Sequence, residues 1–150
     1  MRNVLNIQHL AVINTNNAYG NAYVDGLRQA ADIHAPDMII HQIPMDTSKN
    51  AVKTAVESLK RTEYRFVFAL VQGTETHDAL MTEAFHQGVA GNGKHHWLYG
   101  DSFLGTLDDR KFEKDSPLQK AYSGVVSSLQ VANCRHFVVI LIKSPTFLPI

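Results

Sequence analysis

The segment RFVFALV, residues 65–71, sets the fold class of this sequence. Its residues are apolar without interruption from Phe66 to Val71, so both faces of such a strand would be buried. A parallel sheet covered by helices on both faces requires strands of this kind, whereas an antiparallel sheet with one wet face gives strict alternation. The segment therefore predicts a central strand of a parallel sheet.

Strands and helices alternate on both sides of this segment. Upstream, the pattern predicts strands over 9–13 and 37–43 and helices over 17–34 and 50–61. Downstream, it predicts helices over 75–87 and 116–122, a strand over 95–99, and a fifth strand in GVVSSLQVA, residues 124–132. Such alternation is typical of the α/β class, here a three-layer, doubly wound and mostly parallel sheet with right-handed crossovers.

Composition narrows the function classes. Hydrophobic residues make up 45% and charged residues 19%, which is typical of a globular chain. The 14 Lys and Arg balance the 14 Asp and Glu, so no basic excess favours a nucleic-acid partner. A small neutral or zwitterionic ligand stays compatible with this balance. The single cysteine, Cys134, gives neither an internal disulfide nor a Cys-x-x-Cys metal site.

Neither end of the sequence predicts a targeting or membrane segment. The N-terminal apolar positions are interrupted by Asn, Gln and His, which does not fit a signal peptide. The longest apolar run is Phe137–Ile142, far shorter than the roughly 20 residues that a membrane helix needs. The chain as written is expected to be soluble.

The motifs that would bring a cofactor or a metal fail on their context. GVAGNGK, residues 88–94, fits the start of a P-loop, but His95 follows where Ser or Thr should hold magnesium. The motif also precedes a predicted strand instead of a helix, so a glycine turn explains it better. No G-x-G-x-x-G follows the first strand, and the eight histidines are scattered. We expect no cofactor and no metal.

Polar loops follow the predicted strands, where ligands of open α/β sheets bind. These loops are 14–20, 44–50, 72–76 and 100–103. They carry amides, hydroxyls, carboxylates and aromatic rings: Asn16, Asn17, Tyr19, Gln72, Thr74, Glu75, Asp101, Ser102 and Phe103. The helix N-termini near residues 17 and 75 also offer backbone N–H groups to an anion. The pattern fits either caps and turns or the rim of a binding site.

A resemblance favours the binding site. Tyr19-Gly20 opening the first helix, SLKRTEYRFVFAL at 58–70 and TETHDALMTEAFHQGVAGNGKHHWLYGDSF at 74–103 occur in an order that resembles one family. The chain looks like the second lobe of the receptor-family ligand-binding region, a type I periplasmic-binding-protein-like domain. That region occurs in bacterial amino-acid-binding proteins, natriuretic peptide receptors and class C G-protein-coupled receptors. The resemblance covers residues 9–131, and the tail 132–150 does not follow it.

The resemblance implies a set of ligand-contacting residues. In that family a small ligand lies between two lobes that close like a flytrap. Tyr19 falls at the ligand-facing tyrosine before the first helix, and Gln72 with Gly73 falls at the end of the third strand. Asp101 falls where amino-acid receptors place an acidic group towards the ligand's ammonium, and Phe103 falls where an aromatic residue follows.

Together these observations favour a non-enzymatic ligand-sensing domain with an amino-acid-like ligand. The first lobe is missing, so we expect a fragment that binds weakly alone. In a parent receptor it would signal by lobe closure, as a homo- or heterodimer, at the extracellular face of a membrane or in the periplasm. The alternatives are a small Rossmann-like or flavodoxin-like nucleotide-binding enzyme, and a folded remnant without a ligand whose exposed apolar cleft edge favours self-association.

Overall fold

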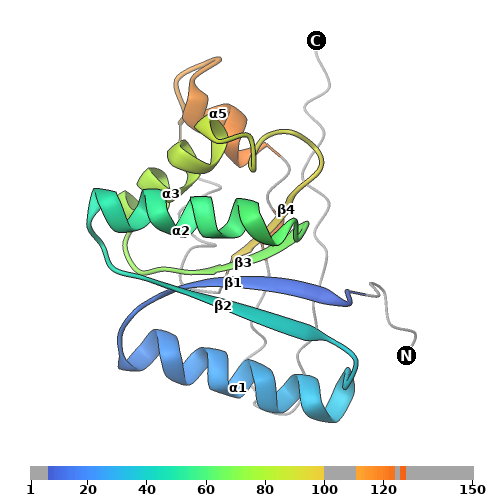
Figure 1. Cartoon of the computed structure of the whole chain (residues 1–150). Coiled ribbons are helices and arrows are strands. Elements are labelled where there is room, and N and C mark those ends of the chain that lie inside the picture. The colour runs from blue at the N-terminus through green and yellow to red at the C-terminus, as the bar shows by residue number, and fades with distance from the viewer. Residues whose placement is uncertain (1–6, 100–110, 124–125, 128–150) are drawn as a thin grey trace.

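The computed structural model describes residues 7–99, 111–123 and 126–127 (Figure 1). The strands are β1 (His9–Thr15), β2 (Ile39–Met45), β3 (Phe66–Leu70), β4 (His96–Tyr99) and β5 (Val126–Ser127). The helices are α1 (Ala18–His34), α2 (Lys49–Thr62), α3 (Thr74–His86) and α5 (Pro117–Tyr122). The predicted alternation of strands and helices is confirmed.

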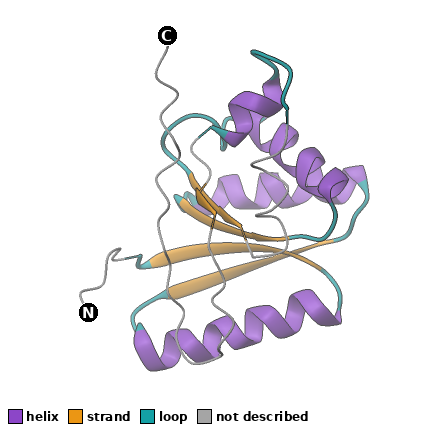
Figure 2. Cartoon of the chain, turned by 180° about the vertical axis from the view of Figure 1, so that it is seen from behind, coloured by secondary structure: helices purple, strands orange, loops and turns teal. Residues whose placement is uncertain are grey.

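The strands form one parallel sheet in the order β2-β1-β3-β4-β5. Helix α1 covers one face of this sheet, and α2, α3 and α5 cover the other (Figures 1 and 2). The structure is therefore the three-layer, doubly wound α/β sheet that the sequence predicts.

The central strand β3 is buried on both of its faces. Val67 and Ala69 belong to the core under α2, α3 and α5, together with the helical residues Val56 and Leu80. Phe68 and Leu70 belong to the second core, which α1 covers with Val24 and Leu27. The uninterrupted apolar run of residues 66–71 is thus explained by two cores that share one strand.

Side-chain caps set where the helices begin. Asn17 caps α1 by accepting a hydrogen bond from the Gly20 N–H, and Ser48 caps α2 by accepting one from the Ala51 N–H. The buried face of α2 consists of residues at three- and four-residue spacing, which all lie in the core: Val52, Ala55, Val56 and Leu59.

Two strands extend further towards their carboxyl ends than predicted. Strand β1 continues through Asn14 and Thr15, and β2 includes Pro44 and Met45, which we expected in a turn. A proline is tolerated on an edge strand where its missing N–H would point away from the sheet. Strand β2 ends the sheet order, and Met45 bonds towards β1, so the neighbouring Pro44 faces outward and removes no bond to β1.

The glycine-rich segment 88–94 is a helix-to-strand turn, as predicted. Gly88, Gly91 and Gly93 have positive φ angles. The Asn92 side chain accepts hydrogen bonds from the backbone N–H groups of Lys94 and His95, at 2.9 and 3.1 Å. This part of the chain folds as a local turn between α3 and β4.

Candidate functional site

The candidate site lies where the chain leaves β1 and β3, which are neighbours in the sheet. After β1 the chain turns to α1 on one face, and after β3 it turns to α3 on the other face (Figure 1). The two loops diverge at this point, and in sheets with the strand order 2-1-3-4-5 the ligand crevice lies at such a switch point. Of the predicted residues, Gln72 and Gly73 belong to the loop after β3, and Tyr19 lies in the first turn of α1, just after the loop that follows β1.

Hydrogen bonds tie the two loops together. The Gln72 backbone N–H donates to the Thr15 hydroxyl at 3.2 Å. The Asn17 side-chain amide donates to the Gln72 side-chain oxygen at 3.3 Å. The same Asn17 caps α1 through its other side-chain atom, the oxygen that accepts from Gly20 at 2.8 Å. Asn17 thus fixes both the start of α1 and the position of the exposed Gln72 side chain.

Tyr19 stands at the surface beside this junction. Its side chain is 54% exposed, and its ring lies 6.3 Å from that of Tyr23. The next residue, Gly20, is buried against the Thr15 carbonyl, and a Cβ at this position would collide with that oxygen. Glycine at position 20 therefore lets the first turn of α1 approach β1, which holds the Tyr19 ring outside the sheet.

Gly73 begins α3 in a conformation that favours glycine. Its φ angle is +83°, and no side chain caps the helix there. The first N–H groups of α3 therefore point towards the crevice without a side-chain acceptor from the cap position. The other two predicted residues, Asp101 and Phe103, lie outside the described residues.

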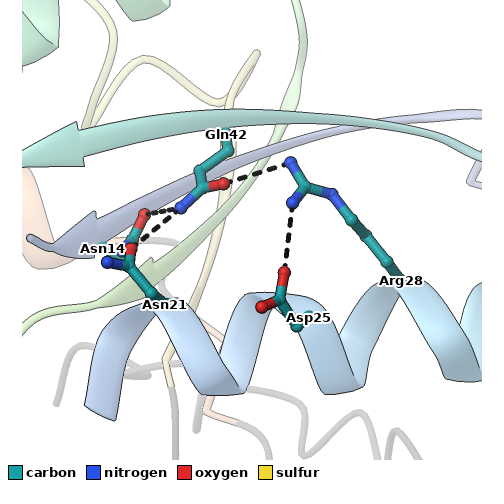
Figure 3. Close-up of polar contacts among 5 residues, drawn as sticks. All are labelled: Asn14, Asn21, Asp25, Arg28 and Gln42. Atoms are coloured by element: carbon teal, nitrogen blue, oxygen red, sulfur yellow. Dashed lines mark hydrogen bonds and ion pairs between the residues drawn. The ribbon is translucent and has the colours of Figure 1, made fainter. Parts of the chain in front are cut away.

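A polar cluster beneath β1 and β2 was not predicted from the sequence. It consists of Asn14, Asn21, Asp25, Arg28 and Gln42 (Figure 3). The Gln42 side-chain amide donates to the side-chain oxygens of Asn14 and Asn21, at 3.1 and 3.2 Å. Asn14 donates to Asn21 at 3.1 Å, and Arg28 donates to Gln42 at 3.1 Å. The cluster holds α1 against the ends of both strands.

The sequence carried a signal for this cluster. Leu10, Val12 and Asn14 alternate on the face of β1 that α1 covers, so Asn14 is a polar residue at a core position. It is fully buried, which requires hydrogen-bond partners nearby. Asn21, Asp25 and Arg28 follow one another at four- and three-residue spacing on one side of α1, which supplies them.

The carboxyl end of β4 is aromatic and buried. Tyr99 is fully buried, its ring lies 4.9 Å from His77 of α3, and burial raises the pKa of its hydroxyl well above the usual 10. Tyr122 of α5 lies 6.3 Å from Tyr99 and donates a hydrogen bond to Asp78 at 3.0 Å. His77 is a core residue, 2% exposed.

Metal binding and membrane insertion find no support in the described part of the chain. No group of three or more His, Cys, Asp or Glu side chains there could hold a metal ion. No helix among the described residues is long and apolar enough to cross a membrane.

A hollow of about 330 Å³ lies elsewhere, between the outer side of β2 and α2. The strand lines it with His41, Gln42, Ile43 and Pro44, and the residues after the strand line it with Asp46, Ala51, Thr54, Ala55 and Ser58. Tyr19 and Gln72 do not line this hollow, so it is separate from the crevice at the switch point.

Comparisons with known proteins bear on the fold alone. No family of known sequences matches the chain, and no curated protein matches it. Among solved structures it is similar to a transcriptional regulator of the LacI family from Burkhoderia phymatum, with a TM-score of 0.50 and 16% identity. The match covers 81% of this chain and 41% of that chain, so this chain spans less than half of its length. This likeness agrees with the three-layer α/β fold of the chain.

Proposed function

We propose that this chain is a ligand-sensing lobe that binds a small, amino-acid-like molecule at the switch point between β1 and β3. The observation that carries the proposal is the junction of Asn17, Gln72 and Thr15, which brings the two diverging loops together at the ends of adjacent strands. Open α/β sheets bind their ligands at such a place. The likeness to 41% of a LacI-family chain supports one lobe of a two-lobed domain.

The chemistry of the two loops fits a zwitterion. The N–H groups at the start of α3 have no side-chain cap and would donate hydrogen bonds to a carboxylate. Glu75, exposed in the first turn of α3, would attract an ammonium group. The resemblance assigns the same role to Asp101. The exposed Tyr19 ring would cover the apolar part of the ligand, and a second lobe would close over it, as in flytrap domains. The domain is then a receptor part without enzymatic activity.

Titration followed by amide NMR tests this proposal, because a half-site should bind weakly. We expect amino acids to shift the amide signals of residues 15–20 and 72–76 first. Gln72→Ala should remove these shifts, whereas Gln29→Ala, an exposed glutamine of α1 outside the crevice, should keep them. Tight binding of an amino acid by this chain alone, measured by calorimetry, would contradict the one-lobe interpretation.

A second candidate is a flavodoxin-like nucleotide-binding protein. The strand order 2-1-3-4-5 favours it, because flavodoxin-like proteins use the same order and hold their cofactor at the same switch point. Gly20 lies in the first turn of α1 and packs closely against the Thr15 carbonyl, so it forms no phosphate cradle there. Thermal-shift screening separates the two: stabilisation by a nucleotide or flavin, and not by amino acids, would favour this candidate.

A further inference from the structure

The outer edge of β2 carries a short row of backbone groups that face away from the sheet. Ile39 donates its N–H to Gln8, and Met45 accepts from the N–H of Asn16, so both residues bond towards β1. In a parallel ladder, alternate residues of a strand bond to the same neighbour. The N–H and C=O groups of Ile40 and Gln42, and the C=O of Pro44, therefore point away from β1. Strand β2 is the end of the sheet within the described residues.

Hydrogen-bond donors for strand pairing are missing or already used at both ends of this row. Pro44 has no N–H to donate, so pairing cannot continue past Gln42 in that direction. At the other end, the Met38 N–H already donates to the Ala35 carbonyl at 2.9 Å. Ile40 and Gln42 are left as the pair of residues with both backbone groups directed outward.

We propose that β2 pairs with β2 of a second copy of this chain, antiparallel, about a two-fold axis at His41. In this register Ile40 of each copy lies opposite Gln42 of the other, and every outward N–H of the two residues meets a C=O. Centring the axis on Gln42 would instead place Ile40 opposite Pro44, which lacks a donor. The pattern is therefore complementary to itself in one register.

The described residues beside this edge include helix α2 and Ile39, which a second copy would approach. A two-fold axis perpendicular to the sheet puts the two α2 helices side by side on the same face. Each would present three small residues that line the hollow and are not fully buried, Ala51, Thr54 and Ser58, and small side chains permit axes about 8–10 Å apart. Ile39, 54% exposed, would lie opposite Ile43 of the second copy and lose water contact.

A second copy also fits the charge of the chain. The formal net charge is zero, so two copies do not repel each other as whole molecules. A foreign strand would meet the same two donors and acceptors. The self-complementary register makes a like copy the occupant that satisfies the edge fully.

Cysteine cross-linking tests the register directly. In a Cys134→Ser background, His41→Cys places two thiols across the axis at a non-hydrogen-bonded position, where Cβ atoms lie about 4.5–5.5 Å apart and a disulfide can form. Ile39→Cys is the matched control, because residue 39 is exposed on the same face of the same strand but faces residue 43. We expect mild oxidation to link the first variant into dimers and to leave the second monomeric.

Ile40→Pro tests the pairing without cross-links. It removes an outward donor and no bond to β1, as Pro44 already does two residues away. Sedimentation velocity over a wide range of concentration should show a reversible dimer for the full chain, weakened about thirtyfold by this substitution through the loss of one donor per copy. A monomeric full chain, equal cross-linking of both cysteine variants, or a dimer indifferent to Ile40→Pro at unchanged thermal stability would each refute the proposal.

Discussion

Two glycines of the same helix should respond in opposite directions to the same substitution. Gly20 and Gly26 both lie in α1, but a Cβ at Gly20 would collide with the Thr15 carbonyl, whereas a Cβ at Gly26 meets nothing within 4 Å. Gly20→Ala should therefore destabilise the protein and Gly26→Ala should stabilise it. The comparison isolates the packing of α1 against β1 from the helix propensity that both positions share.

The expected magnitudes follow from two terms. Alanine is favoured over glycine inside a helix by about 1 kcal/mol, which both variants gain. At Gly20 the obstacle is main chain that cannot rotate away, with the Asn14 side-chain amide 3.1 Å and the Thr15 carbonyl carbon 3.2 Å from the added Cβ. Overpacking of this kind costs about 1–3 kcal/mol, and its upper range applies when the contact is rigid backbone. We expect the two variants to differ by about 3 kcal/mol, which corresponds to a melting-temperature gap of roughly 6–12 °C at this chain length.

Guanidinium denaturation measures this difference through the fluorescence of Trp97. It is the single tryptophan, it is 1% exposed, and its indole N–H donates to Val89 at 2.8 Å, so unfolding changes its surroundings. Because α1 carries Tyr19, Gly20→Ala should also weaken any ligand-induced NMR shift at the crevice. If Gly20→Ala proves as stable as the unmodified protein, the close approach of α1 to β1 is wrong.

Three further predictions concern the polar contacts. Asn14→Leu should lower the free energy of unfolding by about 2–3 kcal/mol, because it breaks the hydrogen bonds to Asn21 and Gln42. Asp25→Ala should lower it by less than about 0.5 kcal/mol, because the 3.4 Å ion pair of Asp25 is exposed, and urea denaturation measures both values. Asn17→Ala should lower the free energy of unfolding by about 1–2 kcal/mol, because it removes the cap of α1. Asn17→Asp should keep the cap and lose only the donor to Gln72. Faster hydrogen exchange of the Gly20 amide in the alanine variant alone would confirm this difference. The raised pKa of Tyr99 means that its hydroxyl stays protonated to a higher pH in the folded state than in the unfolded state. The contribution of the protonated hydroxyl to folding stability is therefore complete below about pH 10 and falls as the pH rises further. Tyr99→Phe should remove this part of the alkaline loss of stability, and identical alkaline unfolding profiles would contradict the burial of the hydroxyl.

Much of the fold could be predicted because burial leaves a direct trace in the sequence. The run at residues 66–71 identified a strand between two cores, and Val52, Ala55, Val56 and Leu59 marked the inner face of α2. The order of the strands could not be predicted in this way, because it depends on which face each crossover takes. The ends of β1 and β2 were placed too early, because Asn14 and Pro44 resemble turn residues until their neighbours are known.

The sequence could place some of the candidate residues at one end of the sheet, but not the contacts between them. Tyr19 and Gln72 could be chosen because the loops after parallel strands gather at one end of the sheet. The tie between Asn17 and Gln72 could not, since 55 positions separate them and their contact requires β1 and β3 to be neighbours. The cluster of Asn14, Asn21 and Gln42 depends in addition on the parallel register of β1 with β2.

The parallel pairing of the strands also has a consequence for the order of folding. Residue 9 pairs with residue 39 and residue 66 pairs with residue 96, but residue 10 of β1 pairs with residue 66 of β3. The β1–β3 junction closes a loop about twice as long, which adds only about 0.6 kcal/mol of chain entropy. We expect the β1–α1–β2 and β3–α3–β4 units to form slightly before they pair with each other. The crevice between β1 and β3 would therefore form last. Pulse-labelled hydrogen exchange should then protect the Gln72 amide after the amides shared by β1 and β2.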